Sequence, residues 1–178
     1  MEKGIILYKS KYGATEKYAN WLAEMTGFDC MEEAKVKVDA VAPYEIIIWC
    51  GGIYASGIAG LSFLKKHMTE LRGRKILVFC VGASPYDENA LKEIKAHNLT
   101  GDLQEIPLFY GRGMWDESRM TWRDRTLCKL LQKSVAKKDP STYKPWMKAL
   151  MCAVGKSCDW TDKNYLTPLM EYLRQAGS

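Results

Sequence analysis

Residues 10–15 are the first place in the chain where residue types and spacing suggest chemistry. The segment consists of Ser10, Lys11, Tyr12, Gly13, Ala14 and Thr15, and it joins a short apolar run to a stretch with helical periodicity. Hydroxyl groups at both ends and a glycine between them suit a loop whose backbone N–H groups surround a phosphate. The N-terminus of the following helix would add positive potential there. The alternative is an ordinary strand-to-helix turn that Thr15 caps.

Two later segments share this character, with small residues, hydroxyls and aromatics and almost no acid or base. Each follows an apolar run of strand length. The first contains Gly51, Gly52, Ile53, Tyr54, Ala55, Ser56 and Gly57, and the second contains Gly82, Ala83, Ser84, Pro85 and Tyr86. Together with residues 10–15, they are the candidate binding residues of the chain.

Four other motifs found in proteins with alternating strands and helices are absent. Gly13 is not followed by the Lys-Ser/Thr of a nucleotide-binding P-loop, and residues 111–116 depart from the dinucleotide fingerprint. Tyr86 stands where a phosphatase of the Cys-x5-Arg type, starting at Cys80, would need arginine. Cys50 ends a strand where a receiver domain would need aspartate. These absences exclude four functions that share the architecture.

The elements that must position the three segments alternate between strand and helix patterns. Strands are predicted near residues 5–8, 29–33, 45–50, 75–81 and 105–110, with helices over about 15–26, 61–71 and 87–97 between them. The apolar runs are continuous, as in a parallel sheet that helices cover on both faces. Ligands of such sheets bind beyond the carboxyl ends of the strands, so we expect the three segments to lie at one edge.

The last third of the chain departs from this alternation. Helices are predicted over residues 118–137, 146–154 and 161–175, with Thr161 or Asp162 as the cap of the last. We therefore expect a single α/β domain over residues 1–178, with a helical insertion at about 112–158.

The net charge of +5 is concentrated in that insertion. Residues 112–148 hold ten Lys and Arg and only four Asp and Glu. One interpretation is a solvated helix face whose apolar side, including Trp122 and Trp146, packs on the sheet. The other is a docking surface for an anionic membrane, an acidic partner or a carboxylated substrate. No nucleic-acid-binding motif accompanies the charge, so we expect no nucleic acid partner.

The first 110 residues resemble the flavodoxin-like family. Residues 10–15 are similar to its phosphate loop, Thr/Ser-x-Thr-Gly-x-Thr, although Tyr12 replaces the central threonine. The resemblance implies a doubly wound, five-stranded parallel sheet in the order 2-1-3-4-5 and FMN as the cofactor. It also implies that the segments after the third and fourth strands enclose the flavin ring, with Tyr54 or Tyr86 stacked on it.

The remaining residues look like the menaquinone-dependent protoporphyrinogen dehydrogenase branch of that family. The similarity lies in residues 109–114, 122–125 and 147–151, and in Asp159 and Trp160 before the last helix. It implies an FMN-dependent oxidoreductase or electron-transfer protein, with a quinone or a porphyrinogen as candidate partner molecules. The alternative is a flavin-free binding module that docks an acidic partner or a membrane through its basic insertion.

Other features exclude further classes. Six cysteines without a Cys-x-x-Cys pair do not form a disulfide scaffold, and no signal sequence is apparent, so we expect a cytoplasmic protein. His67 and His97 lack partners at ligand spacing, so no metal site is predicted. The uncharged stretch 46–64 is broken by glycines, which favours a strand, a loop and a helix start over a transmembrane span.

Overall fold

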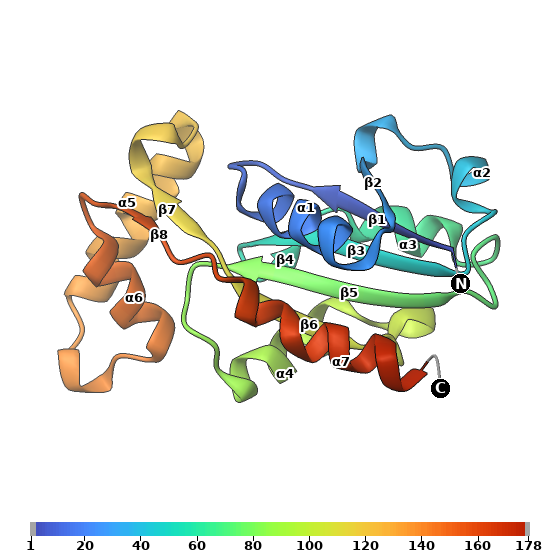
Figure 1. Cartoon of the computed structure of the whole chain (residues 1–178). Helices are drawn as coiled ribbons and strands as arrows, with labels where there is room; N and C mark the ends of the chain where they lie inside the picture. The colour runs from blue at the N-terminus through green and yellow to red at the C-terminus, as the bar shows by residue number, and fades with distance from the viewer. Residues whose placement is uncertain (1–2, 177–178) are drawn as a thin grey trace.

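A computed structural model describes residues 3–176, and its centre is a parallel β-sheet (Figure 1). The parallel strands are β1 (Gly4–Lys9), β2 (Asp29–Glu32), β3 (Ile46–Tyr54), β5 (Lys75–Gly82) and β6 (Leu108–Arg112). They lie in the order β2-β1-β3-β5-β6, and the two-residue β4 (Gly57–Ile58) pairs antiparallel with β3. Counting only the parallel strands, this is the predicted order 2-1-3-4-5.

Helices cover both faces of the sheet, as the apolar strands require. Alternate strand residues such as Ile6, Ile48 and Phe79 face α1 (Ala14–Thr26) and α7 (Thr167–Ala176). The residues between them face the other side, which holds α3 (Leu61–His67), α4 (Glu88–Asn98) and the short α2 (Val38–Val41). Figure 1 shows α1 and α7 side by side in front of the sheet. The predicted doubly wound α/β fold is therefore confirmed.

The segment after the third parallel strand differs from the prediction. β3 does not stop at Cys50 but continues through Gly51 and Gly52 to Tyr54, and then turns back as β4. A Cβ atom on Gly51 would lie 2.5 Å from the Ala59 carbonyl oxygen, so glycine is required by the close return of the chain. The expectation that a loop begins at Gly51 is therefore wrong.

Asn98 holds the turn between β3 and β4 in place. Its side-chain oxygen accepts a hydrogen bond from the Ile58 amide at 2.8 Å, and its side-chain nitrogen donates to the Ser56 carbonyl at 2.8 Å. Ala55 and Ser56 both have positive φ, 47° and 67°, which is costly for residues other than glycine. A buried amide that uses both its oxygen and its nitrogen on the turn offsets that cost.

The insertion stands beyond the carboxyl end of the sheet, at the left of Figure 1. It consists of β7 (Met114–Asp116), α5 (Trp122–Ala136), α6 (Pro145–Ala153) and β8 (Ser157–Asp159), and β7 and β8 form an antiparallel ribbon. Val135, Met147 and Leu150 form its own small core. The interpretation that Trp122 packs on the sheet is wrong, because 71% of this side chain is exposed. Trp146 packs within the insertion core.

Several predicted boundaries also need correction. The helix expected from residue 118 begins at Trp122, because the Thr121 side chain caps it by accepting from the Asp124 amide at 3.3 Å. The last helix begins at Thr167, after a 3₁₀ turn whose cap is Asp162. The strand expected from residue 105 begins at Leu108, after a turn in which the Ile106 amide bonds the Leu103 carbonyl.

The uncharged stretch 46–64 forms strands β3 and β4 and the first half of α3. Over residues 3–176, no helix has both the length and the apolar character needed to cross a membrane.

Candidate functional site

The loop after β1 has the geometry of an anion-binding turn. Gly13 is left-handed, with φ of 97°, and its amide donates to the Ser10 hydroxyl at 3.1 Å. No side chain caps α1, which starts at Ala14 directly behind the loop, while Thr15 is buried beneath it. The first amides of α1 therefore point toward the space in front of the loop, where the helix dipole favours a negative group.

The Lys11 and Tyr12 side chains of this loop are engaged by the insertion. Both the Lys11 ammonium and the Tyr12 hydroxyl donate to the Asp124 carboxylate on α5, and the Tyr12 hydroxyl accepts from the Thr121 amide at 3.3 Å. The hydrogen bond from Lys11 lowers the pKa of Asp124, and the same contact raises the pKa of Lys11. Asp124 thus stands close to where a phosphate would bind.

The β3–β4 turn lies beside this loop. The Tyr54 and Tyr12 rings meet edge to face with centroids 6.5 Å apart, and the Lys11 ammonium lies 5.9 Å from the Tyr54 ring. Burial raises the pKa of the Tyr54 hydroxyl. Gly57 begins β4, whereas Gly51 and Gly52 are buried within β3. The turn thus brings Tyr54, Ala55 and Ser56 to the carboxyl edge of the sheet.

The segment after β5 is held by the edge strand β6. The Tyr110 hydroxyl donates to the Ser84 carbonyl, and the Arg112 Nε donates to the Ala83 carbonyl at 3.0 Å. Desolvation raises the pKa of Tyr110, which keeps this hydroxyl protonated as a donor. Tyr86 is 55% exposed, with its ring centroid 6.3 Å from that of Tyr110. The backbone at residues 83–84 is therefore fixed, and the Tyr86 ring is accessible.

Hydrogen bonds hold the insertion against the carboxyl edge of the sheet, at the two points where the chain enters and leaves the insertion. The Gly113 amide donates to the Gly82 carbonyl at 2.8 Å, and the Trp160 amide donates to the Gly113 carbonyl at 3.0 Å. The Arg112 guanidinium lies 4.0 Å from the centroid of the Trp160 ring. These contacts place β7 and β8 directly beside the segment that follows β5.

A cavity of about 950 Å³ lies between the sheet edge and the insertion. One wall comes from the second and third candidate segments, including Ser56 and residues 82–85. A second comes from α4 and its cap, and it contains Asp87, Asn89, Ala90, Leu91, Glu93, Ile94 and His97. The third comes from the insertion and the residue after it, and it contains Trp115, Cys128, Leu131, Lys144, Trp146, Leu150 and Trp160. We call this cavity the edge groove. The side chains of residues 10–15 are not among its lining.

One polar atom of the groove has no partner. Trp115 lines the groove, and its indole N–H is the only fully buried side-chain polar atom in residues 3–176 that makes no hydrogen bond. An unsatisfied buried donor is costly, and no partner in the described residues offsets that cost.

The comparison with known families decides the identity of the fold. A model of the flavodoxin domain matches residues 5–142. The chain belongs to the flavodoxin-domain family. This confirms the flavodoxin-like resemblance of the first 110 residues, and no curated protein matches the chain.

Solved structures with a similar flavodoxin fold come from several bacteria. A putative flavoprotein from Bacteroides eggerthii is 16% identical, with a TM-score of 0.49, over 78% of this chain and 100% of that one. The Trp repressor binding protein from Bacillus subtilis is 12% identical, with a TM-score of 0.45, over 62% and 85%. The two-electron reduced flavodoxin from Megasphaera elsdenii is 19% identical, with a TM-score of 0.44, over 60% and 82%. These likenesses concern the fold.

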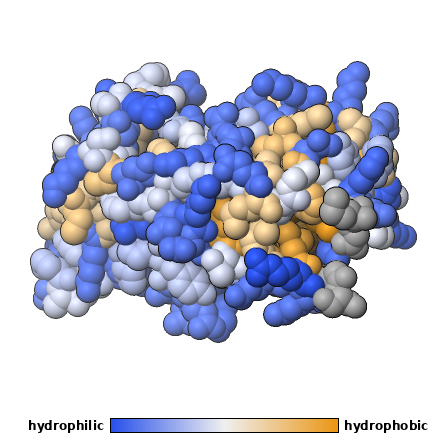
Figure 2. All heavy atoms as spheres, in the orientation of Figure 1, coloured by the Kyte–Doolittle hydropathy of each residue, from blue (hydrophilic) through white to orange (hydrophobic). Residues whose placement is uncertain are grey.

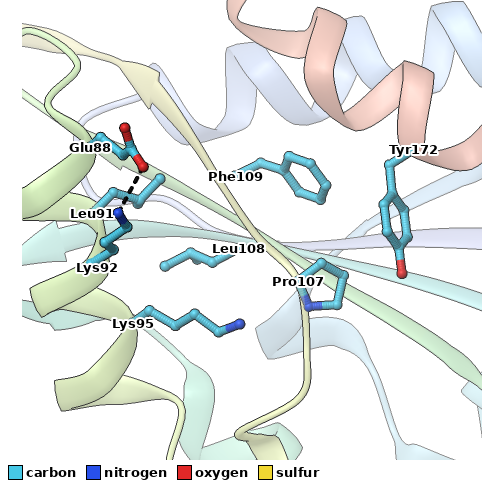
Figure 3. Close-up of a pocket in the computed structure, with 8 residues that line it drawn as sticks. All are labelled: Glu88, Leu91, Lys92, Lys95, Pro107, Leu108, Phe109 and Tyr172. Carbon is cyan, nitrogen blue, oxygen red and sulfur yellow. Dashed lines mark ion pairs between the residues drawn. The ribbon is translucent and has the colours of Figure 1, made fainter.

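The flavodoxin domain has a second, smaller cavity of about 370 Å³ at its edge strand (Figure 3). It lies at the start of β6, where Leu108 and Phe109 are flanked by α4 and by Tyr172 of α7. The charged pair at its rim, Lys92 with Glu88 at 2.8 Å, bonds within α4. This smaller cavity lies away from the carboxyl edge of the sheet, and none of the candidate residues lines it.

Some residues of the flavodoxin domain's site escaped sequence reasoning. The role of Asp124 was not predicted, because this residue lies in a stretch dominated by basic residues. Its position three residues after Thr121 matches a helix-capping pattern. Tyr110, Trp115 and Asn98 carry no local motif, because their roles arise from contacts between elements distant in the chain. Of the three, only Trp115 lies in the insertion, where aromatic residues are concentrated.

Proposed function

We propose that this flavodoxin domain is an FMN-dependent redox protein that exchanges electrons with a second molecule held in the edge groove. The observation that carries the proposal is the groove itself. It runs from the segments expected to enclose a flavin ring to an aromatic wall supplied by the insertion. A simple electron carrier needs no such aromatic wall, so the groove favours a bound reaction partner.

The residues present fit FMN. The left-handed turn at Gly13 and the uncapped start of α1 would hold its phosphate, with the Ser10 and Thr15 hydroxyls beside it. Tyr54 and Tyr86 are the aromatic side chains available to the ring, and the fixed backbone at residues 83–84 would meet its edge. When bound, FMN supplies the capacity to accept and release one or two electrons.

The groove supports a flat, largely apolar partner molecule. Tryptophans 115, 146 and 160 and Leu150 give it an apolar wall, Lys144 adds a cation, and Asp87 and Glu93 add carboxylates on the α4 side. The unpartnered Trp115 N–H would serve as a donor after a shift of its ring that exposes it. A quinone carbonyl would accept from Trp115, and a porphyrinogen carboxylate would pair with Lys144. We therefore propose an activity like that of the menaquinone-dependent protoporphyrinogen dehydrogenases.

Reconstitution with FMN tests the first part of this proposal. The purified chain is incubated with FMN, desalted and examined for retained flavin absorbance and for quenching of flavin fluorescence. We expect stoichiometric flavin, with weaker retention in Ser10→Ala and unchanged retention in the control Ser62→Ala, whose serine lies on α3. A chain that retains no flavin under any of these conditions contradicts the proposal.

Turnover by the reconstituted protein tests the second part. Bleaching and recovery of the flavin band are followed with a quinone and with a porphyrinogen. Trp115→Phe keeps the apolar ring but removes the donor, so we expect a higher KM for a carbonyl-bearing acceptor and an unchanged flavin content. Identical kinetics of this variant with every acceptor would remove the assigned role of Trp115.

A second candidate function, a flavin-free binding module, is favoured by one observation. Asp124 already occupies the Lys11 and Tyr12 side chains of the phosphate loop, as a bound phosphate would. If that contact is permanent and blocks the site, the original chain binds no FMN, whereas Asp124→Asn does. Flavin binding by the original chain excludes this alternative.

A further inference from the structure

The outward face of α5 carries a stripe of exposed leucines. Leu127, Leu130 and Leu131 are 65%, 58% and 44% exposed, and their spacing of three and one places them along one side of the helix. At the start of the same helix, Trp122 is 71% exposed. The adjoining face provides the packing, since Gln132 and Val135, one and four residues after Leu131, are buried. We call Trp122, Leu127, Leu130 and Leu131 the α5 stripe.

Unpaired basic residues surround the α5 stripe. Arg123, Lys129 and Lys133 are exposed on α5, and across residues 3–176 none of them forms an ion pair. Arg125 does not belong to this set, because its guanidinium donates to the Glu117, Ser118 and Met120 carbonyls and holds the turn before the helix.

The acidic residues of the insertion do not neutralise this surface. Asp124 is bound to the phosphate loop, and Glu117 accepts a hydrogen bond from the Gln132 side chain at 2.7 Å. Asp116 accepts from Ser118 and Ser157, and Asp139 caps a 3₁₀ turn. All four carboxylates are thus engaged in holding the insertion together, and the cations beside the α5 stripe remain without counter-charges.

We propose that the α5 stripe is a docking surface for an anionic phospholipid membrane. A helix lying in the membrane interface combines leucine and tryptophan on its buried side with lysine and arginine that reach the headgroups. A second copy of the chain fits less well. A two-fold contact through the stripe would bring Arg123, Lys129 and Lys133 against their own copies. Charge therefore selects an anionic surface.

The stripe is continuous with the edge groove. Leu131 belongs to the α5 stripe and also lines the groove. Cys128, one turn earlier on α5, lines the groove as well. Docking through α5 would place the mouth of the groove at the membrane, from which an apolar molecule could enter. This consequence rests on the proposed redox function, whereas docking itself does not.

The other apolar surface of the molecule lacks this combination. Figure 2 shows that hydrophobic residues on its visible face gather mainly between α1 and α7. Two lysines lie over the Trp21 ring of α1, and both are paired: Lys163 with Glu24 at 3.1 Å and Lys17 with Asp159 at 2.9 Å.

Vesicle sedimentation tests the proposal on the full chain. The protein is mixed with vesicles of phosphatidylcholine alone or with about one third phosphatidylglycerol, at low and high salt. We expect binding to the anionic vesicles, little to the neutral ones, and weakening by salt. Leu127→Ser with Leu130→Ser should weaken binding at least about ten-fold, and Lys129→Ser with Lys133→Ser about five-fold per lysine. Tryptophan fluorescence should shift to the blue on binding, less so in Trp122→Phe.

Matched controls separate docking from general surface effects. Met25→Ser with Met31→Ser removes two other exposed apolar side chains, and Lys65→Ser with Lys66→Ser removes two other exposed lysines. Both should bind like the original chain. No binding to anionic vesicles, or equal binding by the leucine variant, overturns the proposal. A dimer that the leucine variant dissociates would show that a second copy covers the stripe instead. FMN content, measured in parallel, reports on the redox proposal independently.

Discussion

The sheet domain and the insertion use apolar residues in opposite ways. In the sheet domain, most apolar residues of the inner strands β1, β3 and β5 are buried between two helical layers. In the insertion, Val135, Met147 and Leu150 make a small core while three leucines and a tryptophan of α5 face outward. Apolar residues therefore drive folding in the sheet domain, whereas several of those in the insertion are exposed and available to contact another molecule.

The largest expected effect contrasts one leucine from each region. Leu64 on α3 is fully buried, so Leu64→Ala should destabilise the protein by about 2–5 kcal/mol through lost burial and the cavity left behind. Leu127→Ala should change stability by less than about 0.5 kcal/mol, because its side chain already contacts solvent. Denaturant unfolding measures both. A large loss in Leu127→Ala would mean that the α5 stripe is packed against the protein.

A smaller effect concerns the insertion core. Val135 is 1% exposed, and Val135→Ala removes two methylene equivalents of burial, about 2 kcal/mol. Since few apolar contacts join the insertion to the sheet domain, the loss should appear as faster amide hydrogen exchange in α5 and α6, with exchange in β1, β3 and β5 unchanged. Leu130→Ala, on the same helix but exposed, is the control. Equal acceleration across the sheet would show that the two regions unfold together.

The same difference between the sheet domain and the insertion explains which elements could be predicted from the sequence. Uninterrupted apolar runs such as residues 46–50 are buried, so the strands and the edge that gathers the candidate segments were predictable from the residues. The strand order was predicted only through the resemblance to the flavodoxin-like family. Gly51 and Gly52 led to the wrong prediction of a loop. A glycine that is required because another backbone segment packs closely against it cannot be told from a loop glycine by sequence. In the insertion, helical periodicity indicated that α5 has two faces but not which one packs. The β7–β8 ribbon, three residues per strand, was too short to predict.

Contacts between the two regions could not be predicted from local patterns at all. Asp124 lies 112 residues from Tyr12, and nothing in either segment indicates the other. The candidate phosphate loop was found from its own residues, but the carboxylate that engages it came only from the structure.

The smallest expected effect tests that contact. Asp124→Asn removes a negative charge from the candidate phosphate site and frees Lys11 and Tyr12, so FMN should bind about three- to five-fold more tightly, as expected for a partly exposed ion pair. Fluorescence quenching of FMN measures the affinity. Asp139→Asn, which changes an aspartate that caps a remote turn, should leave it unchanged.

The pH dependence of FMN affinity shows whether the charge of Asp124 causes the difference between Asp124→Asn and the original chain. Lys11 lowers the pKa of Asp124, so the contact stabilises the folded protein above the ordinary carboxyl pKa and is lost as the pH falls below about 4. The difference in FMN affinity between Asp124→Asn and the original chain should therefore be constant near neutrality and disappear in acid. The phosphate monoester loses one of its two negative charges near pH 6, which also weakens its repulsion by Asp124, so the loss due to Asp124 is measured below about pH 5, where the charge of the phosphate is constant. A difference that persists below about pH 4 would mean that the substitution acts through the position of α5 rather than through its charge.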